Sequence, residues 1–264
     1  MYKVRPKKSL GQHFLHDQQI AQRIVSALVP KTEANSVLEI GPGMGVLTTY
    51  LLKQHDTNLK VIEIDRDSIA YLRAHFPALR SSIIEGDFLD ADVENIFPSN
   101  FSIIGNFPYN ISSQIFFSVL DHRNKVDQVV CMLQKEVAER IASPPGSKVY
   151  GILSVLLQAY YTIKLLFKVP PGVFTPPPRV MSAVIRLERN NTIRLACDET
   201  LFVQVVKQAF NTRRKTLRNA LKNLNLPAEI SSLEIMDKRA EQLSVEAFVN
   251  LTQLIENSRG GAAG

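Results

Sequence analysis

The stretch "VLEIGPGMGVLT", residues 37–48, joins a short apolar run to a turn that contains Gly41, Gly43 and Gly45. An apolar run of this length is typical of a buried strand, and glycines after it allow a sharp turn into a helix and a close approach of ligand to backbone. The third glycine comes one residue too early for the dinucleotide pattern G-x-G-x-x-G. Glu39 would also repel a pyrophosphate, whereas it would favour a cationic ligand. The stretch therefore predicts the first strand and ligand turn of an α/β sheet.

The rest of the first two thirds of the chain repeats this alternation of strand and helix. β-branched runs separated by helical stretches predict an α/β sheet with helices on both faces. The first four strands have the spacing of parallel units, and the last two, joined by "VPPGVFTPPPRV", predict a hairpin at the sheet edge because prolines are excluded from central strands. The predicted strands are 36–40, 59–64, 82–85, 101–105, 126–133, 163–169 and 181–187.

The strand pattern ends near residue 190, and helical periodicity replaces it. Within "AFNTRRKTLRNAL" the spacing predicts one long helix with Phe210, Leu217 and Leu221 on its apolar face and basic residues elsewhere. We therefore predict two domains: a sheet domain over residues 1–191, with a basic segment over 1–17, and a small all-helical domain over 192–264. The tail "SRGGAAG" lacks apolar anchors and is predicted to be disordered.

Composition narrows the class of protein. The chain has 264 residues, 45% of them hydrophobic, which is enough for a substantial core. Cys131 and Cys197 lie far apart and match no zinc or disulfide spacing, so we expect no metal site. No stretch has the pattern of a signal peptide or of a membrane-spanning helix, and a soluble, cytoplasmic protein is expected.

Positive charge gathers in two clusters. The net charge is +6 and the pI is about 9.3. Basic clusters bind polyphosphates with release of counterions, which indicates nucleic acid as a partner, although solvated faces would have the same composition. The clusters comprise Lys3, Arg5, Lys7 and Lys8 near the N-terminus, and Arg213, Arg214, Lys215, Arg218 and Lys222 in the helical domain.

Two further acids follow predicted strands. Glu63, in "VIEID", lies about 20 residues beyond the glycines, where a carboxylate can accept both hydroxyls of a ribose. Asp87, in "EGDFLD", ends the third predicted strand, where it can accept from an adenine amino group. Each residue alone could be a turn or a helix cap. The order of glycine turn, ribose acid and adenine acid predicts the S-adenosylmethionine site of a Rossmann-like methyltransferase.

The fourth strand leads into "NFPYNIS", residues 106–112. An exocyclic adenine amine is a weak nucleophile because its lone pair is delocalised into the ring. The side-chain oxygen of Asn106 and the backbone carbonyl of Pro108 could each accept one of its hydrogens, and Tyr109 could stack on a flipped base. Phe107 is expected to pack in the core. These residues predict a pocket for methylating the N6 atom of adenine.

The motifs together resemble those of the KsgA/RsmA family of small-subunit rRNA adenine N6 dimethyltransferases. The resemblance covers nearly the whole chain and rests on "KKSLGQHFL", "ExGxGxG", "VIEID", "GDF", "NFPYNIS" and "FTPPPRVMSAVIRL". It implies catalytic roles for Asn106, Pro108 and Tyr109, with Phe174 as the opposite stacking wall for the target adenine. It implies cofactor contacts from Gln12, His13, Leu15, Gly41, Gly43, Glu63, Asp87 and Asn106.

The resemblance also implies a substrate. Members are expected to dimethylate two adjacent adenines near the 3′ end of 16S rRNA within the small (30S) ribosomal subunit. For this chain we expect a monomer that needs no metal and no membrane, although the sequence leaves the oligomeric state open. The RNA would contact Lys7, Lys8, Arg213, Arg214, Lys215 and Arg218. Three positions depart from the commonest family pattern: His13, Phe107 and Met181.

Three other functions share part of this pattern. A large-subunit (23S) adenine methyltransferase of the antibiotic-resistance type has the same pocket chemistry. A non-catalytic RNA-binding assembly or transcription factor could have the same fold, although intact Asn106, Pro108 and Tyr109 argue against it. A nicotinamide dehydrogenase is disfavoured by the glycine spacing.

Overall fold

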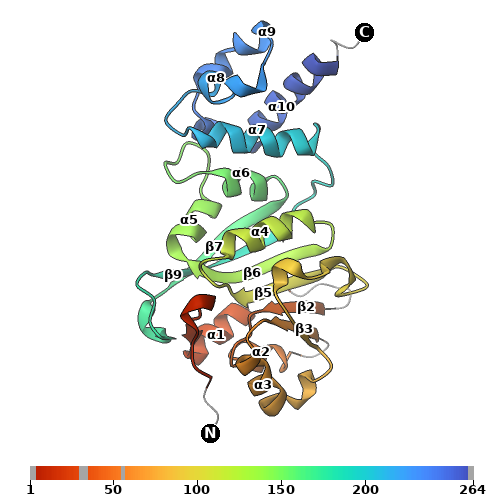
Figure 1. Cartoon of the computed structure of the whole chain (residues 1–264), viewed down its shortest axis with the longest axis vertical. Coiled ribbons are helices and arrows are strands. Elements are labelled where there is room, and N and C mark those ends of the chain that lie inside the picture. Colours follow the sequence, from red (N-terminus) through yellow and green to blue (C-terminus); the bar gives the residue numbers. More distant parts are fainter. Residues whose placement is uncertain (1–3, 30–34, 55–56, 261–264) are drawn as a thin grey trace. The chain divides into compact units, whose positions relative to one another are not determined.

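The computed structural model describes residues 4–29, 35–54 and 57–260 (Figure 1). The chain folds into two compact units. The first unit comprises Met1–Ala138 and Thr162–Arg189, and the second comprises Glu139–Tyr161 and Asn190–Gly264. Lys3, one of the predicted basic residues, lies outside the described part.

A seven-stranded sheet forms the first unit, with the strand order β4-β3-β2-β5-β6-β9-β7. The pairs β2–β3, β2–β5, β3–β4 and β5–β6 are parallel, and β6–β9 is antiparallel. Every predicted strand is confirmed to within a few residues. The strands are β2 (Asn35–Ile40), β3 (Thr57–Glu63), β4 (Ile83–Glu85), β5 (Phe101–Asn106), β6 (Val126–Gln134), β7 (Tyr161–Val169) and β9 (Ser182–Arg189).

Helices cover both faces of this sheet, as the apolar strands require. In β5 the run from Phe101 to Gly105 is buried throughout, which is typical of a central parallel strand. Figure 1 shows α4 on one side of the sheet and α1, α2 and α3 on the other. Right-handed crossovers place α4 opposite α2 and α3, because the strand order reverses between β2 and β5. The bounds are α1 (Gln18–Val25), α2 (Thr48–Leu51), α3 (Arg66–His75) and α4 (Ser112–Asp121).

The Pro-rich connection between β7 and β9 contains a short strand that the sequence pattern did not predict. β8 (Phe174–Thr175) pairs antiparallel with β1 (Phe14–Leu15), so the connection holds the N-terminal segment. His16 strengthens this pairing because its backbone N–H donates to the carbonyl of Val173 at 3.0 Å. Two strands of two residues carry too little periodicity to be recognised in a sequence.

Helices make up the second unit, and it begins earlier than predicted. The segment 139–161 belongs to it, although the sequence pattern placed this segment in the sheet domain. In this segment α6 (Ile152–Gln158) packs with α7 (Glu199–Asn211) and α10 (Val245–Gly260). Tyr150 is buried edge-on to Phe210, with ring centroids 6.2 Å apart. The other helices are α5 (Lys135–Ala142), which crosses into this unit, α8 (Leu217–Ala220) and α9 (Ala228–Ser231).

The prediction of one long basic helix over "AFNTRRKTLRNAL" is wrong. α7 ends at Asn211, and α8 begins only at Leu217. The helix breaks because the chain between them turns to form an antiparallel bridge from Thr216 to Arg239, where the N–H of Leu217 donates to Lys238 at 2.8 Å. Arg213, Arg214 and Lys215 therefore lie on the turn between α7 and α8 and not on a helix.

The prediction of a disordered tail is wrong for residues 258–260, because α10 includes them. Residues 261–264 lie outside the described part. In the portion of the chain that is described, no helix has both the length and the apolarity needed to cross a membrane.

Gly105 on β5 lies close to the backbone of the neighbouring strand β2. A Cβ built there would lie 2.6 Å from the backbone oxygen of Ile40 on β2. We expect Gly105→Ala to lower the free energy of unfolding of the first unit by about 2 kcal/mol, because the clash forces two central strands apart. Urea unfolding followed by circular dichroism measures this. Gly172→Ala is the control, since a Cβ there meets nothing within 4 Å. Equal midpoints for the two variants would contradict the prediction.

Candidate active site

A cavity of about 270 Å³ lies in the first unit where the parallel strands end. This is the edge at which doubly wound sheets bind ligands. Its wall combines the ends of β2, β3 and β5 and the turn after β4 with residues 9–14 of the N-terminal segment. The structure brings these predicted site residues together around it: Gln12, His13, Gly41, Gly43, Glu63, Asp87, Asn106, Pro108 and Tyr109.

The glycine turn shapes the floor of the cavity. Gly41 has φ +65°, and a Cβ built on it would meet no atom within 4 Å, so its side faces open space that a ligand can occupy. Gly43 has φ +56°, and a Cβ there would lie 2.8 Å from the ring of Phe14. The first glycine therefore leaves room for a ligand, whereas the second leaves room for the N-terminal segment.

Glu63 ties this turn to the end of β3. It is 4% exposed, and its two oxygens accept from three backbone N–H groups. Oε2 accepts from Gly43 at 3.0 Å, while Oε1 accepts from Ile64 at 3.0 Å and Asp65 at 2.9 Å. Burial raises the pKa of Glu63, although the N–H groups oppose the shift. A carboxylate has about four acceptor positions, so one remains for a ligand hydroxyl.

Glu39 is a second buried acid beside the turn. It lines a small neighbouring cavity of about 30 Å³ together with Gly41 and Asn106. The hydroxyl of Thr48 donates to its Oε2 at 2.6 Å. Burial and, to a lesser extent, the charge of Glu63 raise the pKa of Glu39 to about 8, against the opposing bond from Thr48. A cation bound nearby would favour the ionised form.

Asp87 follows β4, where it both caps a helix and lines the cavity. Its Oδ1 accepts from the N–H of Leu89 at 3.0 Å, which caps a short 3-10 helix over Phe88–Asp90. Its carboxylate also lines the cavity, and within the described chain its other oxygen has no protein partner. The cap fixes the side chain while leaving one oxygen available for a ligand amine.

Asn106 is held in one orientation. Its Nδ2 donates to the backbone carbonyl of His13 at 2.9 Å. Because a carbonyl can only accept, the amide nitrogen must face His13, and the amide oxygen is left as an acceptor. The nearby carbonyl of Pro108 accepts a long bond from Ile111, at 3.3 Å, and retains a second lone pair. Two acceptors therefore line the same part of the cavity.

Tyr109 is fixed from two sides. Its hydroxyl lies 2.5 Å from the Oγ of Ser182, which is buried at the start of β9. Its ring stacks on that of His13, with centroids 5.4 Å apart and planes 28° apart. Burial raises the pKa of Tyr109, against the bond to Ser182. The hydroxyl therefore stays neutral near pH 7 and leaves a rigid aromatic face.

Comparison with known proteins identifies the family. The family model described as "Ribosomal RNA adenine dimethylase" matches residues 4–257. The chain belongs to this family. It is 59% identical to "Ribosomal RNA small subunit methyltransferase A" of Cytophaga hutchinsonii, covering 97% of this chain and 99% of that protein. It is 55% identical to the protein of the same name in Parabacteroides distasonis, covering 99% and 98%.

Solved structures of this dimethylase family and its neighbours have the same fold. A dimethyladenosine transferase from Plasmodium falciparum matches with a TM-score of 0.78 and 26% identity, covering 94% of this chain and 98% of that one. The 23S rRNA methyltransferase ErmE matches with a TM-score of 0.65 and 24% identity, covering 90% and 99%. The second likeness shows the fold alone. The predicted Rossmann-like methyltransferase fold is confirmed, and so is the enzyme class.

S-adenosyl-L-methionine is the methyl donor of the dimethylase family, and the residues present fit it. Gly41 leaves open space at the turn, and Glu63 and Asp87 each keep an acceptor position on the cavity side. The sulfonium and the amino group carry positive charge, which offsets the cost of burying Glu39 and Glu63 beside the turn.

Two predicted residues of the dimethylase pocket lie elsewhere. Phe174 does not line the cavity: it is 3% exposed and packs in the core beside Leu15, its pairing partner in β1. The stacking wall expected from it is therefore not formed here. Leu15 lines the small cavity of Glu39 rather than the large one. Both side chains hold the N-terminal segment onto β8.

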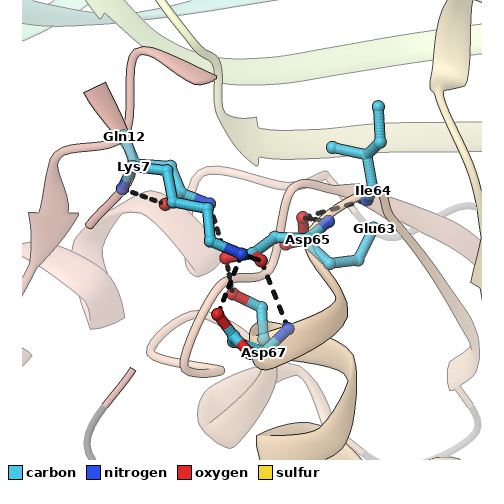
Figure 2. Close-up of polar contacts among 7 residues, drawn as sticks. Lys7, Gln12, Glu63, Ile64, Asp65 and Asp67 are labelled. Carbon is cyan, nitrogen blue, oxygen red and sulfur yellow. Dashed lines mark hydrogen bonds and ion pairs between the residues drawn. The ribbon is translucent and has the colours of Figure 1, made fainter. Parts of the chain in front are cut away.

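Asp65 and Ile64 were missed by the sequence analysis. Asp65 is 2% exposed and binds the N-terminal segment (Figure 2). Its only signal was its place before a helix, which a simple cap also explains. Ile64 lines the cavity and is 49% exposed. It is the last residue of a predicted strand, and this position is the sequence feature that could have indicated its role.

The predicted RNA-binding cations divide into two groups. Lys7 binds Asp65 and Asp67, Arg213 donates to the carbonyls of Lys148 and Tyr150, and Arg218 donates to Asp237 and Ser231. In contrast, the side chains of Lys8, Arg214 and Lys215 are exposed and have no partner among the described residues. The two groups therefore differ in how freely they could meet a phosphate.

The raised pKa of Glu39 predicts a pH dependence of stability. In the folded protein the pKa is about 8, against 4.5 as its ordinary value, so the folded state holds a proton that the unfolded state releases. This contribution is complete below pH 4.5 and is lost as the pH rises towards 8. We expect wild type to lose on the order of 3 kcal/mol more than Glu39→Gln between pH 5 and 8. Urea unfolding at the two pH values measures the difference.

Glu94→Gln is the matched control, because Glu94 is exposed. It should follow the wild-type pH profile. A Glu39→Gln profile that coincides with wild type would show that Glu39 is ionised in the folded state.

Proposed function

We propose that the chain dimethylates N6 of two adjacent adenines near the 3′ end of 16S rRNA in the small ribosomal subunit. The relatives at 59% and 55% identity are named as small-subunit methyltransferases and match almost the full length of the chain. The observation that carries the chemistry is the fixed amide of Asn106, whose oxygen stays available as an acceptor in the cavity.

The cofactor would lie over the glycine turn. Glu63 would accept from the ribose and Asp87 from the adenine amine, while Gly41 would approach the methionine part, with Gln12 and His13 above. When bound, S-adenosyl-L-methionine supplies a methyl carbon whose bond to sulfur breaks as a bond to N6 forms. The N-terminal segment, which lines the cavity, would cover the bound cofactor.

The chain's part in the reaction is to orient the target amine. The amide oxygen of Asn106 and the carbonyl of Pro108 would each accept one N6 hydrogen, which turns the lone pair out of conjugation with the ring and towards the methyl carbon. The displaced proton leaves to water. After one transfer the amine keeps one hydrogen, so one acceptor still holds it for the second transfer.

The target adenine would stack on Tyr109 after leaving the RNA stack. Ser182 and His13 hold this ring, so the base meets a preformed surface rather than a mobile side chain. A fixed ring lowers the entropy cost of placing the base. We give Phe174 a supporting role only, through its pairing with Leu15.

RNA phosphates would bind the exposed cations Lys8, Arg214 and Lys215, whose side chains are not already engaged. The bonded residues Lys7, Arg213 and Arg218 hold the protein's own structure instead. With a ribosomal substrate, the enzyme would act in the cytoplasm. We propose a monomer as the working unit.

Labelled methyl transfer to small subunits from cells that lack the enzyme tests the function. We expect dimethyladenosine in the small-subunit rRNA with wild type, and a rate at least about 100-fold lower with Asn106→Ala, since one acceptor is lost. The cofactor affinity of the variant should stay close to wild type in calorimetry. Asn95→Ala is the control, because Asn95 lies on an exposed turn outside the cavity.

Two results would reject this proposal. Absence of label from small subunits, together with label in large subunits assayed in parallel, would favour the 23S activity. Full activity of Asn106→Ala would show that the amide oxygen does not orient the amine.

The free cations of the second unit lead to a separate prediction. We expect Arg214→Gln combined with Lys215→Gln to raise the KM for small subunits and to reduce the slope of log affinity against log salt by about 2, because two phosphate contacts are lost. The cofactor affinity should not change. Filter binding at a series of salt concentrations measures the slope, with Arg259→Gln, an exposed cation on α10, as control. An unchanged slope would remove both residues from the RNA interface.

A further inference from the structure

The N-terminal segment makes up one whole side of the cavity. Six consecutive residues of it, Ser9 to Phe14, line the wall. Its later part is anchored by β1 and by the bond from Asn106 to the carbonyl of His13. In the described chain, the polar contacts of residues 7–12 with the rest of the first unit go to Asp65, after β3, and to Asp67, in the first turn of α3 (Figure 2).

Asp65 is the centre of these contacts. Its carboxylate is buried and accepts from four donors. Two of them come from the N-terminal segment, the ammonium of Lys7 and the Nε2 of Gln12 at 3.1 Å. The others are local, the hydroxyl of Ser68 at 3.1 Å and the N–H of Asp67 at 3.2 Å. Burial alone would raise the pKa of Asp65, but these hydrogen bonds outweigh it and the pKa is lowered.

Lys7 makes two further contacts in this cluster. Its ammonium also contacts the carboxylate of Asp67 at 2.8 Å, and its backbone N–H donates to the Oε1 of Gln12 at 2.8 Å. Gln12 therefore bridges the Lys7 backbone and the Asp65 carboxylate, which fixes a residue of the cavity wall.

The same loop also reaches the glycine turn. The N–H of Asp65 donates to Oε1 of Glu63, and the other oxygen of Glu63 accepts from Gly43. A continuous series of hydrogen bonds thus runs from Lys7 through Asp65 and Glu63 to the turn. A buried carboxylate that loses its cation is costly, so the two sides of the cavity depend on this pair.

We propose that Lys7 and Asp65 form a latch that holds the N-terminal segment closed over the cofactor cavity. Both are positioning residues: they act through Gln12 and Glu63 and need not touch the cofactor. The assignment rests on the proposed cofactor site and gives Lys7 a role different from the phosphate contact that its charge alone suggested. Lys8, its exposed neighbour, keeps the RNA role.

Titration calorimetry with S-adenosylhomocysteine and no RNA tests the latch. We expect Lys7→Met to weaken binding by about tenfold, because the segment loses its charged anchor. Lys7→Arg should restore affinity to within about twofold, since a guanidinium can also bridge two carboxylates. Lys8→Met, the matched control, should bind the ligand like wild type, because its side chain has no partner among the described residues.

Hydrogen exchange gives a second readout that does not depend on the ligand. In the free protein, Lys7→Met should speed exchange in residues 7–12, whereas Lys8→Met should not. In steady-state assays on small subunits, Lys7→Met should raise the KM for S-adenosylmethionine and keep the wild-type kcat at saturation.

The outcomes separate the latch from the proposed function. Equal ligand affinity and equal exchange in wild type and Lys7→Met would overturn the latch alone. Unchanged ligand affinity with a reduced salt slope for RNA would overturn it in favour of a phosphate contact. Failure of wild type to bind the ligand would reject the proposed function, and the latch with it.

Discussion

Two buried carboxylates at the end of β3 hold the site together. Glu63 binds the glycine turn through Gly43, and Asp65 binds the N-terminal segment through Lys7 and Gln12. Because the two acids are separated by one residue and linked by a hydrogen bond, the floor and the cover of the cavity are positioned by a single strand end. A shift of β3 would therefore displace both walls at once.

Burying acids at this edge costs stability, and the chain compensates each acid differently. Asp65 is compensated within the protein by an ammonium and three further donors. Glu63 receives backbone N–H groups, and Glu39 is bonded by the hydroxyl and the backbone of Thr48. The less compensated acids lie at the cavities, where a cationic cofactor can supply the missing charge. The incompletely compensated acids therefore lower the stability of the free protein and favour binding of the cofactor.

The fold and most of the site could be predicted from the sequence, because both rest on local patterns. Buried strands are apolar runs, and the glycine turn, Glu63, Asp87 and Asn106 lie at strand ends that a parallel sheet gathers at one edge.

What could not be predicted depends on contacts between distant residues. The role of Lys7 needs its partner Asp65, which lies 58 positions away. The break between α7 and α8 depends on the bridge to Arg239, and the place of Phe174 on its pairing with Leu15. Residues 139–161 follow a strand in sequence yet pack with later helices. Local periodicity contains none of this information.

The N-terminal segment also connects the cofactor cavity with the proposed pocket for the base. The carbonyl of His13 fixes the amide of Asn106, and the ring of His13 stacks on Tyr109. One residue of the segment thus fixes both the proposed acceptor for the amine and the proposed stacking ring for the base. Asp65 holds Gln12, which is the neighbour of His13. The contacts that fix the wall of the cofactor cavity therefore also help to fix His13 beside the proposed base pocket. A base pocket that depends on a closed segment is complete only when the cofactor cavity is covered.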